Sequence, residues 1–375
     1  MKKLYTLLLL SFTAVGFSQA PANYYNSATG TGYTLKTQLK AIITAGHIDR
    51  GYAGLWTTYA TSDRDMGIGY ENDNTIVDIY SENPVGTDPY NFIYDINQCG
   101  TYTNEGDCYN REHLVPQSYF EDVTTDYTRT DAHHIVPTDG KVNNYRNNYA
   151  FGKVNTATYT SQNGSKLGPL LNSGYSAGAG TPVVFEPIDE FKGDVARCFL
   201  YFATRYEDQM DEFYASKTLA QVPAKAMFDG SINKVFSSTF LNILLTWNQQ
   251  DPVSAKEMKR NNAIYTRQGN RNPYIDNNAY VTAIWGLPAL STQTFDALAN
   301  VSVYPNPANN HRINIETEQI LNEIQLININ GQLMQEIKNP NAQNNTYTLE
   351  NLPSGFYFLK LASENQSTVK KIIVN

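Results

Sequence analysis

The chain has 375 residues, enough for one large domain or two ordinary ones, and its hydrophobic fraction of 41% is typical of a globular protein. Only 17% of the residues are charged, and the formal net charge is −8. This acidic balance excludes strong nonspecific attraction of nucleic acid to the whole surface, although a single basic region can still bind it. The low charge and the 27 tyrosines favour a protein that works outside the cell.

The first twenty residues have the pattern of an export signal. Lys2 and Lys3 precede a mostly apolar run over residues 4–17, and residues 18–20 (SQA) resemble a small-x-small cleavage site. A buried N-terminal helix is the alternative. No other stretch of the sequence reaches the roughly 18 apolar residues that a membrane helix needs, so we expect a soluble, exported protein.

Residues 21–290 predict a mixed domain in which helices dominate. Apolar residues recur at helical spacing in four segments, 34–44, 189–207, 239–247 and 253–265. The pattern is clearest where Phe191, Val195 and Phe199 mark one buried face. Residues 155–182 are rich in glycine, serine, threonine and asparagine, which predicts a loop.

The sequence changes character after residue 290. Apolar and polar side chains alternate in four short segments, 312–316, 324–329, 356–361 and 369–374. Asn330-Gly331 follows the second of them and is a strong hairpin signal. We therefore predict a linker over residues 291–300 and a small β-sandwich over residues 301–375, with residues 303–307 as its rigid entrance and His311 at its surface.

The motifs of this tail resemble a known family. Residues 304–310 (YPNPANN), the NG hairpin, residues 352–360 (LPSGFYFLK) and the basic end at Lys370-Lys371 are similar to the C-terminal sorting domain of the type IX secretion system. The resemblance implies passage across the outer membrane, followed by cleavage, release or surface attachment. A carbohydrate-binding or adhesive sandwich is the alternative.

Three cysteines remain to be placed. Cys99 and Cys108 flank a segment rich in glycine, asparagine and aspartate, so we expect them to form a disulfide, which export permits. Cys198 lies in an apolar helical segment and is expected to be a buried thiol. Three free thiols are the alternative. Since no CxxC pair exists, the sequence argues against a zinc site with cysteine ligands.

Residues 109–118 carry the first candidate chemistry. His113 can act as a general base because a histidine is largely neutral near pH 7. Its neighbour Glu112 would point in the opposite direction on a strand and can supply an oxygen ligand to a hard cation. Asparagines of residues 143–148, on what we expect to be a short helix, can supply an amide oxygen. A surface ion pair, or a hydrogen-bonded core histidine, is the alternative for His113.

His133 and His134 form a second candidate pair. A zinc site is conceivable, but no HExxH spacing accompanies the two residues. A structural role, in which they hydrogen-bond the backbone of the site, is the alternative.

Several blocks, taken in order, resemble the core of the endonuclease I family. They are residues 110–118 (NREHLVPQS), 131–143 (DAHHIVPTDGKVN) and 146–152 (RNNYAFG), within a likeness that extends from about residue 50 to 287. Members of this family are secreted or periplasmic nonspecific nucleases with a His-Me (ββα-metal) finger. The resemblance implies an α+β fold, in which a mainly helical domain is built on a ββα-metal core.

The resemblance also implies roles for single residues. His113 matches the general base, Glu112 the first metal ligand, and Asn148 the asparagine that completes the protein's metal coordination. The implied cofactor is Mg²⁺, with Mn²⁺ or Ca²⁺ as alternatives. The residues implied to hold the finger in shape behind these groups are Asp131, His133 and His134.

The phosphate-binding arginine of the family cannot be aligned, because this chain is short between the two blocks. Arg129 and Arg146 are the candidates for that role, and Arg111 is a further candidate for contact with nucleic acid. A basic run lies further along the chain, at Lys256, Lys259, Arg260, Arg267 and Arg271. A solvated helix face and a phosphate-binding surface are both open interpretations of this run.

The reading that these observations favour is a secreted, metal-dependent endonuclease. We expect it to hydrolyse DNA, and RNA as well, with little sequence specificity and to leave 5′-phosphate ends. Expected partners are the nucleic acid and the type IX secretion machinery, and the protein is expected to be a monomer. The alternatives are a metal-dependent phosphodiesterase acting on small phosphoesters and a non-enzymatic surface-binding protein.

Overall fold

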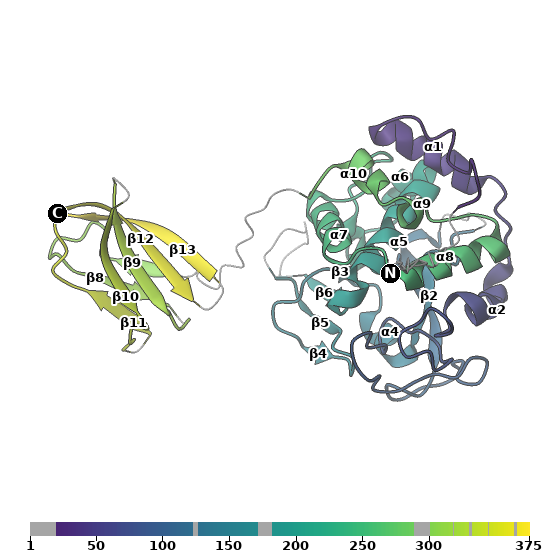
Figure 1. Cartoon of the computed structure of the whole chain (residues 1–375), viewed down its shortest axis with the longest axis horizontal. Coiled ribbons are helices and arrows are strands. Elements are labelled where there is room, and N and C mark those ends of the chain that lie inside the picture. Colours follow the sequence, from purple (N-terminus) through teal and green to yellow (C-terminus); the bar gives the residue numbers. More distant parts are fainter. Residues whose placement is uncertain are drawn as a thin grey trace, which may run out of the picture. The chain divides into compact units, whose positions relative to one another are not determined.

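The computed structural model describes residues 20–122, 127–171, 182–288, 301–317, 319–329, 332–343, 345–363 and 366–375. The chain divides into two compact units, one ending at Pro288 and the other beginning at Ala289. Figure 1 shows helices and small sheets in the first unit and strands in the second. The expected export signal (except Ala20), the expected linker and the Asn330-Gly331 turn lie outside the described residues.

The described helices all belong to the first unit. They are α1 (Gly32–Thr44), α2 (Gly51–Ser62), α3 (Gln117–Phe120), α4 (Gly140–Arg146), α5 (Lys192–Arg205), α6 (Met210–Ser216), α7 (Ser238–Gln250), α8 (Ala255–Gln268), α9 (Pro273–Asp276) and α10 (Ala279–Trp285), with 3₁₀ turns at Asp189–Phe191, Glu207–Gln209 and Pro223–Met227. The four helices predicted from spacing are confirmed as α1, α5 with the 3₁₀ turn before it, α7 and α8.

Helix α5 forms the centre of the first unit's core. Every residue of this helix except Asp194 is buried, so it has no solvent-exposed face. The predicted apolar positions Phe191, Val195 and Phe199 all lie in the main hydrophobic cluster. Burial of one such side chain stabilises the fold by about 1.5–3 kcal/mol, so this helix contributes much of the unit's stability.

Local sequence defines both ends of α8. The Ser254 side chain accepts a hydrogen bond from the Glu257 backbone N–H, and the Glu257 side chain in turn accepts one from the Ser254 backbone N–H. Gly269 ends the helix at φ 83°, in the left-handed region, where a Cβ atom would also lie 2.3 Å from the Gly46 carbonyl oxygen. Glycine is therefore required at this position by conformation and by space.

The first unit contains two small sheets. Strands β1 (Tyr109–His113) and β2 (Ile135–Asp139) form an antiparallel pair. A four-stranded sheet has the order β3-β6-β5-β4, and its strands are β3 (Ala150–Phe151), β4 (Tyr159–Thr160), β5 (Lys166–Pro169) and β6 (Val183–Glu186). Within it only β3 and β6 run parallel.

The loop predicted over residues 155–182 is wrong where β4 and β5 lie. Strand β5 pairs with β6 in the register Lys166 with Glu186 and Gly168 with Val184. The partner strand therefore starts beyond the segment whose composition predicted a loop. Pairing with a distant, apolar strand decides the local structure here, which composition within the segment does not reveal.

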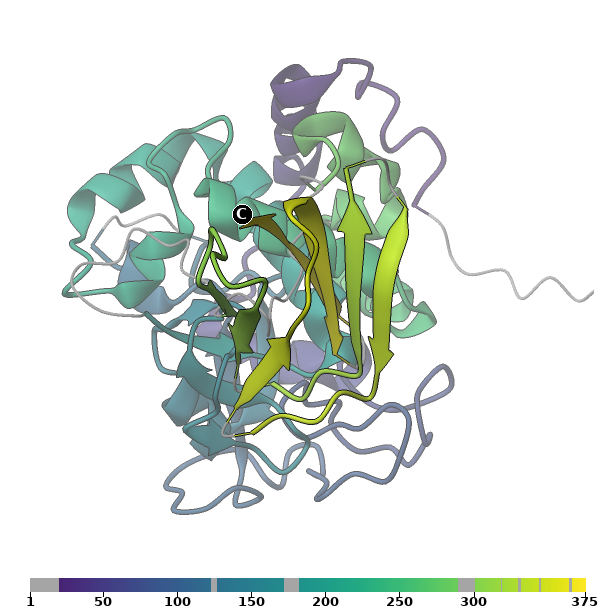
Figure 2. The same cartoon turned by 90° about the vertical axis from the view of Figure 1, so that its left-hand side faces the viewer.

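The second unit is rich in strands. They are β7 (Ser302–Tyr304), β8 (Ile313–Glu316), β9 (Glu323–Asn328), β10 (Leu333–Lys338), β11 (Thr346–Leu349), β12 (Gly355–Ser363) and β13 (Gln366–Val374). Two antiparallel sheets result, with strand orders β10-β9-β12-β13 and β11-β8-β7, and Figure 2 shows both. One hydrophobic cluster contains Ile313 and Ile315 from the smaller sheet and Leu359 and Leu361 from the larger. The sheets thus share a core, as in a sandwich.

Several smaller expectations are confirmed. Cys99 and Cys108 form a disulfide, and Cys198 is a buried free thiol whose pKa burial raises to about 12. His311 is exposed, and its Nδ1 lies 2.8 Å from the Leu352 carbonyl oxygen. In the described part of the chain, no helix combines the length and apolar character needed to cross a bilayer.

Candidate active site

The site is built on β1, β2 and the helix that follows them. The two strands pair from Tyr109 opposite Asp139 to His113 opposite Ile135. Asp139 ends β2 and also caps α4, because its side chain accepts hydrogen bonds from the backbone N–H groups of Lys141 and Val142. The chain therefore passes directly from the second strand into the helix, and α4 is held close to the end of the strand pair.

The disulfide braces this corner. Cys108 immediately precedes β1, and its carbonyl oxygen accepts a hydrogen bond from the Gly140 backbone N–H at 2.9 Å. A Cβ atom on Gly140 would lie 2.5 Å from the Cys99 sulfur, so only glycine fits there. The bridge thus packs directly on the first residue of α4, which ties the start of β1 to the turn between β2 and α4.

A polar pocket of about 730 Å³, a volume that includes space open to solvent, lies beside the end of β1. It is lined by Tyr102, Asn110, Arg111, Glu112, His113, Pro116, Gln117, Ser118, Asn143, Asn144, Arg146, Asn147 and Asn148. The structure thus brings Glu112, His113 and Asn148 together in one place, as the sequence predicted. Glu112 and His113 both reach the pocket although they are consecutive strand residues.

Glu112 is held by two partners. The carboxylate is only 3% exposed, and its Oε1 accepts a hydrogen bond from the Tyr80 hydroxyl at 2.9 Å. The same oxygen lies 3.1 Å from Nη1 of Arg146. Burial raises the pKa of Glu112, while the Arg146 charge and the Tyr80 hydrogen bond lower it, and the net shift is upward. Both partners contact Oε1, which leaves Oε2 to serve as a ligand in the pocket.

His113 presents a free nitrogen. Nε2 is buried and has no hydrogen-bond partner among the described residues. Burial lowers the pKa of His113 to about 3, with a further contribution from the nearby His134, while a hydrogen bond to the Arg129 backbone acts in the opposite direction. The imidazole is therefore neutral at pH 7, and its Nε2 lone pair can accept a proton.

The sequence suggested that Asn148 lies on a short helix. In the structure it lies two residues beyond the end of α4. Asn147 ends the helix with φ 51° and turns the chain so that Asn148 lines the pocket. The Asn148 Nδ2 is 3.4 Å from the Ser118 hydroxyl and 3.5 Å from the Gln221 carbonyl oxygen. Since both contacts use the nitrogen, the amide oxygen is available as a ligand.

Arg146 is buried behind this site. It is 1% exposed and donates hydrogen bonds to the carbonyl oxygens of His113 at 2.9 Å and Leu114 at 2.5 Å, in addition to its ion pair with Glu112. The guanidinium thus binds the end of β1 and the Glu112 carboxylate at once. These contacts make Arg146 a positioning residue and disfavour the phosphate-binding role considered for it.

Two other arginines lie close to His113. The guanidinium of Arg111 lies 3.6 Å from the ring centroid of Tyr52, and that of the exposed Arg129 lies 5.6 Å from it. Tyr52 stacks near His113, with 6.0 Å between ring centroids. The charges of both arginines lower the pKa of His113, which reflects their proximity to the ring. Their charges make the potential around the His113 ring positive.

Asp131 lies in a buried network behind the strand pair. Its Oδ2 accepts hydrogen bonds from the hydroxyls of Tyr201 and Tyr206 at 2.8 and 2.9 Å, and Oδ1 accepts one from Gln268 at 2.6 Å. Burial alone would raise the pKa of Asp131, but the charge of His133 leads a set of interactions that holds it below its ordinary value.

The two adjacent histidines bond to backbone, as the structural alternative expected. His133 Nε2 lies 3.1 Å from the Asn270 carbonyl oxygen, and His134 Nε2 lies 2.8 Å from that of Thr128. Burial lowers the pKa of His133 to about 3 and that of His134 to about 4. The His134 ring is 6.0 Å from His113, so it packs behind the candidate base.

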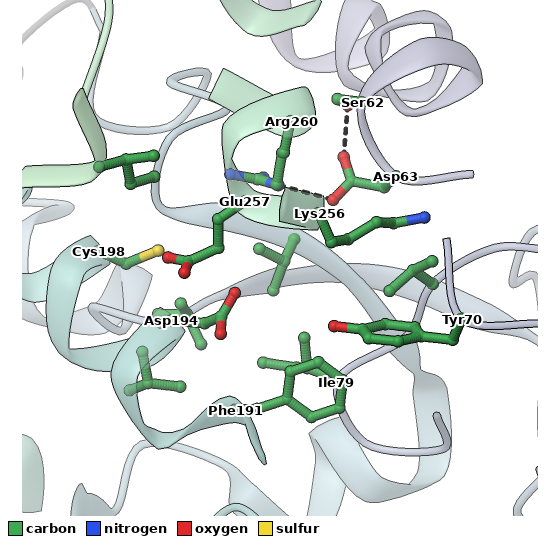
Figure 3. Close-up of a pocket in the computed structure, with 15 residues that line it drawn as sticks. Ser62, Asp63, Tyr70, Ile79, Phe191, Asp194, Cys198, Lys256, Glu257 and Arg260 are labelled. Atoms are coloured by element: carbon green, nitrogen blue, oxygen red, sulfur yellow. Dashed lines mark hydrogen bonds and ion pairs between the residues drawn. The ribbon is translucent and has the colours of Figure 1, made fainter. Parts of the chain in front are cut away.

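The basic run on α8 and after it lies elsewhere. Lys256 pairs with Asp65 at 3.2 Å and Arg260 with Asp63 at 2.7 Å, and both cations line a separate internal pocket of about 550 Å³ that Figure 3 shows. That volume includes space open to solvent, and the wall of the pocket includes buried apolar side chains.

The other members of the run are also engaged. Lys259 donates to the carbonyl oxygens of Arg64 and Met66, Arg267 Nε lies 3.4 Å from the Thr58 hydroxyl, and Arg271 pairs with Asp276 at 2.6 Å. The structure gives these cations carboxylate, carbonyl or hydroxyl partners within the fold. We therefore do not place the substrate on this run.

Two residues of the site had no signal in the sequence. Tyr80 supports Glu112, and Tyr52 stacks near His113 and contacts the Arg111 guanidinium. Neither tyrosine belongs to a recognised motif, and the sequence has many others. Only the tertiary contacts distinguish them.

Comparisons with known proteins show which families the chain matches. The Endonuclease I family model matches residues 31–279, and the Secretion system C-terminal sorting domain model matches residues 302–375. An extracellular ribonuclease of Bacillus subtilis is 33% identical over 75% of this chain and 84% of its own length. An extracellular ribonuclease of Bacillus amyloliquefaciens is 32% identical over 70% of this chain and 78% of its own length. An endonuclease-1 of Buchnera aphidicola is 24% identical over 49% of this chain and 69% of its own length.

The first unit is thus the catalytic part of an exported nuclease, a hydrolase that acts on nucleic acid. The chain belongs to the endonuclease I family and carries a C-terminal sorting domain for secretion to the cell surface or beyond.

Proposed function

We propose that this nuclease is a metal-dependent endonuclease that hydrolyses DNA and RNA with little sequence specificity and leaves 5′-phosphate ends. The observation that carries the proposal is the unpartnered Nε2 of His113 in a pocket that also contains Glu112 and Asn148. We assign the ββα-metal finger expected from the resemblance to the strands β1 and β2 with α4.

The residues of the pocket fit a hard divalent cation. Glu112 offers Oε2 and Asn148 offers its amide oxygen, which are the ligand types that Mg²⁺ prefers together with water and substrate oxygens. We assign the metal site to these two residues, with Mg²⁺ as the ion and Mn²⁺ or Ca²⁺ as alternatives. When bound, the ion would neutralise charge on the phosphate and on the departing oxygen.

The protein's own groups supply the proton transfer and the orientation. His113 Nε2 accepts the proton of a water that attacks phosphorus in line with the departing oxygen. The Arg129 backbone and the His134 ring hold the imidazole, and Arg146 fixes the strand end and Glu112. Arg111 and Arg129 bind the phosphate backbone, which carries no sequence information, so little specificity results.

The open pocket supports a polymer as substrate. A small phosphoester would be better served by a closed cavity that surrounds it, whereas a polar pocket open to solvent admits a strand that continues beyond the site. The relatives named extracellular ribonuclease support RNA as one substrate. An intact set of Glu112, His113 and Asn148 argues against a non-enzymatic surface protein.

The direct test is degradation of plasmid DNA and of a long RNA by the purified protein with Mg²⁺ or with EDTA, alongside His113→Ala. We expect cleavage that needs the metal and falls by about 10²–10⁴-fold in the variant. The matched control is His311→Ala, which removes an exposed histidine of the second unit and should leave cleavage unchanged. If the wild-type protein leaves both polymers intact with Mg²⁺, Mn²⁺ and Ca²⁺, the proposal is wrong.

A further inference from the structure

Three carboxylates gather outside the candidate active site, in the long connection between α2 and β1. Glu71, Glu82 and Asp88 each place one side-chain oxygen within 4.8 Å of the other two. Lys256, whose pKa burial lowers and the Glu82 charge raises, is engaged elsewhere, since it pairs with Asp65 at 3.2 Å. The three carboxyl groups therefore face one another at short range.

Glu82 supplies a second and separate observation. Its side chain is buried, at 2% exposure, and its Oε1 has no hydrogen-bond partner among the described residues. Buried polar atoms are almost always hydrogen-bonded, and an unpaired buried carboxylate costs several kcal/mol. A buried oxygen without a partner, on a residue of an acidic cluster, points to a missing positive ligand.

The electrostatics of the cluster are consistent with this. Burial and then the charges of Asp88 and Glu71 raise the pKa of Glu82 to about 9, and burial raises that of Asp88 to about 6. A bound cation would reduce the repulsion among the three carboxylates and satisfy them directly.

We propose that Glu71, Glu82 and Asp88 bind a Ca²⁺ ion at a structural site that is distinct from the catalytic metal site. Calcium takes 6–8 oxygen ligands at roughly 2.3–2.6 Å in flexible geometry, so one ion can contact three oxygens that lie within 4.8 Å of one another. Three carboxylates in irregular loops suit this ion better than Mg²⁺, which demands near-ideal octahedral geometry and retains its waters.

The site has a structural consequence for the pocket on β1. One short segment carries Asp78, Tyr80 and Glu82. Asp78 accepts a hydrogen bond from the Asp139 backbone N–H at 2.6 Å, and Tyr80 donates to Glu112 at 2.9 Å. An ion bound at Glu82 would fix the end of this segment and so stabilise two supports of the strand–helix corner. The inference does not depend on the proposed nuclease mechanism.

The experiment is calcium titration of the purified protein, followed by calorimetry and by thermal unfolding. A Glu112→Gln background weakens the catalytic metal site, so calcium that still binds reports on the second site. We expect one bound Ca²⁺ in that background. At about 100 times its Kd, the unfolding temperature of the first unit should rise by roughly 5–10 °C.

Two variants remove ligands, and one serves as a matched control. Glu82→Gln should abolish the calcium-dependent rise, and Glu71→Gln, at an exposed position that tolerates substitution, should weaken binding at least tenfold. The control is Glu212→Gln, an exposed carboxylate on α6 that should leave the response unchanged.

Two results would overturn the proposal. One is the absence of calcium binding in the Glu112→Gln background, which would mean that the cluster is satisfied by shared protons. The other is an equal calcium response in wild type and Glu71→Gln, which would place any bound ion elsewhere. Both readouts measure binding and unfolding, so they remain decisive if the protein cleaves no nucleic acid.

Discussion

The two units of this chain bury different kinds of side chain. Among the described residues of the second unit, Thr317 is the only polar residue that is fully buried, and the rest of its core is apolar. The first unit buries charged groups such as Asp131, Arg146 and Arg197, each satisfied by partners far away in the sequence. A sorting domain needs only a stable sandwich, whereas a hydrolytic site needs charged groups held in fixed positions, and burial with partners provides this.

The largest effect is expected from breaking the buried ion pair of the first unit. Arg146→Met leaves Glu112 buried without its counter-charge and should lower the free energy of unfolding by about 3–5 kcal/mol. Cleavage should fall as well, because the end of β1 loses its clamp. Denaturant unfolding of the protein measures the predicted loss of stability. The control is Arg312→Met, which removes a surface pair of 3.5 Å in the second unit and should cost less than about 1 kcal/mol.

The apolar core of the second unit is tested by Leu359→Ala. This side chain is fully buried between the sheets, so its truncation should cost the second unit roughly 2–5 kcal/mol. Nuclease activity should not change if the units fold independently. Differential scanning calorimetry together with an activity assay separates the two effects, and a parallel loss of cleavage would show that the units depend on each other.

The buried histidines give the first unit a pH dependence that one substitution isolates. The pKa of His134 in the fold, about 4, lies below its unfolded value of about 6.5, so the stability it contributes is present above pH 6.5 and is lost as pH falls towards 4. As the pH falls over that range, the free energy of unfolding of the wild type should decrease by about 3 kcal/mol more than that of His134→Gln. Unfolding curves at several pH values measure this difference. The control is His311→Gln in the second unit, which should leave the pH dependence of the first unit's stability unchanged.

The smallest effect concerns a support of Glu112. Tyr80→Phe removes one hydroxyl from a buried hydrogen bond of 2.9 Å and should cost about 1 kcal/mol of stability. The cleavage rate should fall roughly tenfold, because the Glu112 carboxylate would no longer be held in position as a metal ligand. If kcat falls while the metal concentration for half-maximal activity stays the same, Tyr80 acts on stability or substrate and not on the metal ligand. Tyr145→Phe, at an exposed position, is the control.

The sequence predicted the elements whose signal is local. Helix α5 was predictable because Phe191, Val195 and Phe199 repeat along one face. The strands of the second unit were predictable because apolar and polar side chains alternate between neighbouring residues. Strands β4 and β5 were missed because β5 pairs with β6, which lies outside the segment that composition described, and β4 pairs in turn with β5.

The candidate site divides in the same way. The order of motifs along the chain was enough to group Glu112, His113 and Asn148, because the resemblance covers several blocks at once. The environment of these residues was not predictable. Arg146 was considered for phosphate and instead holds Glu112, while the basic run around Lys256 faces carboxylates within the fold.

The sequence by itself thus determined the class of protein, its two units and the candidate reactive residues, because motifs and periodicity are properties of neighbours along the chain. Only the tertiary structure decided which cations are free to meet a phosphate, which tyrosine supports Glu112, and which carboxylates lack a partner. These depend on contacts between residues that are distant in sequence. The energy of a charge is set by what surrounds it in space, and no local pattern encodes that.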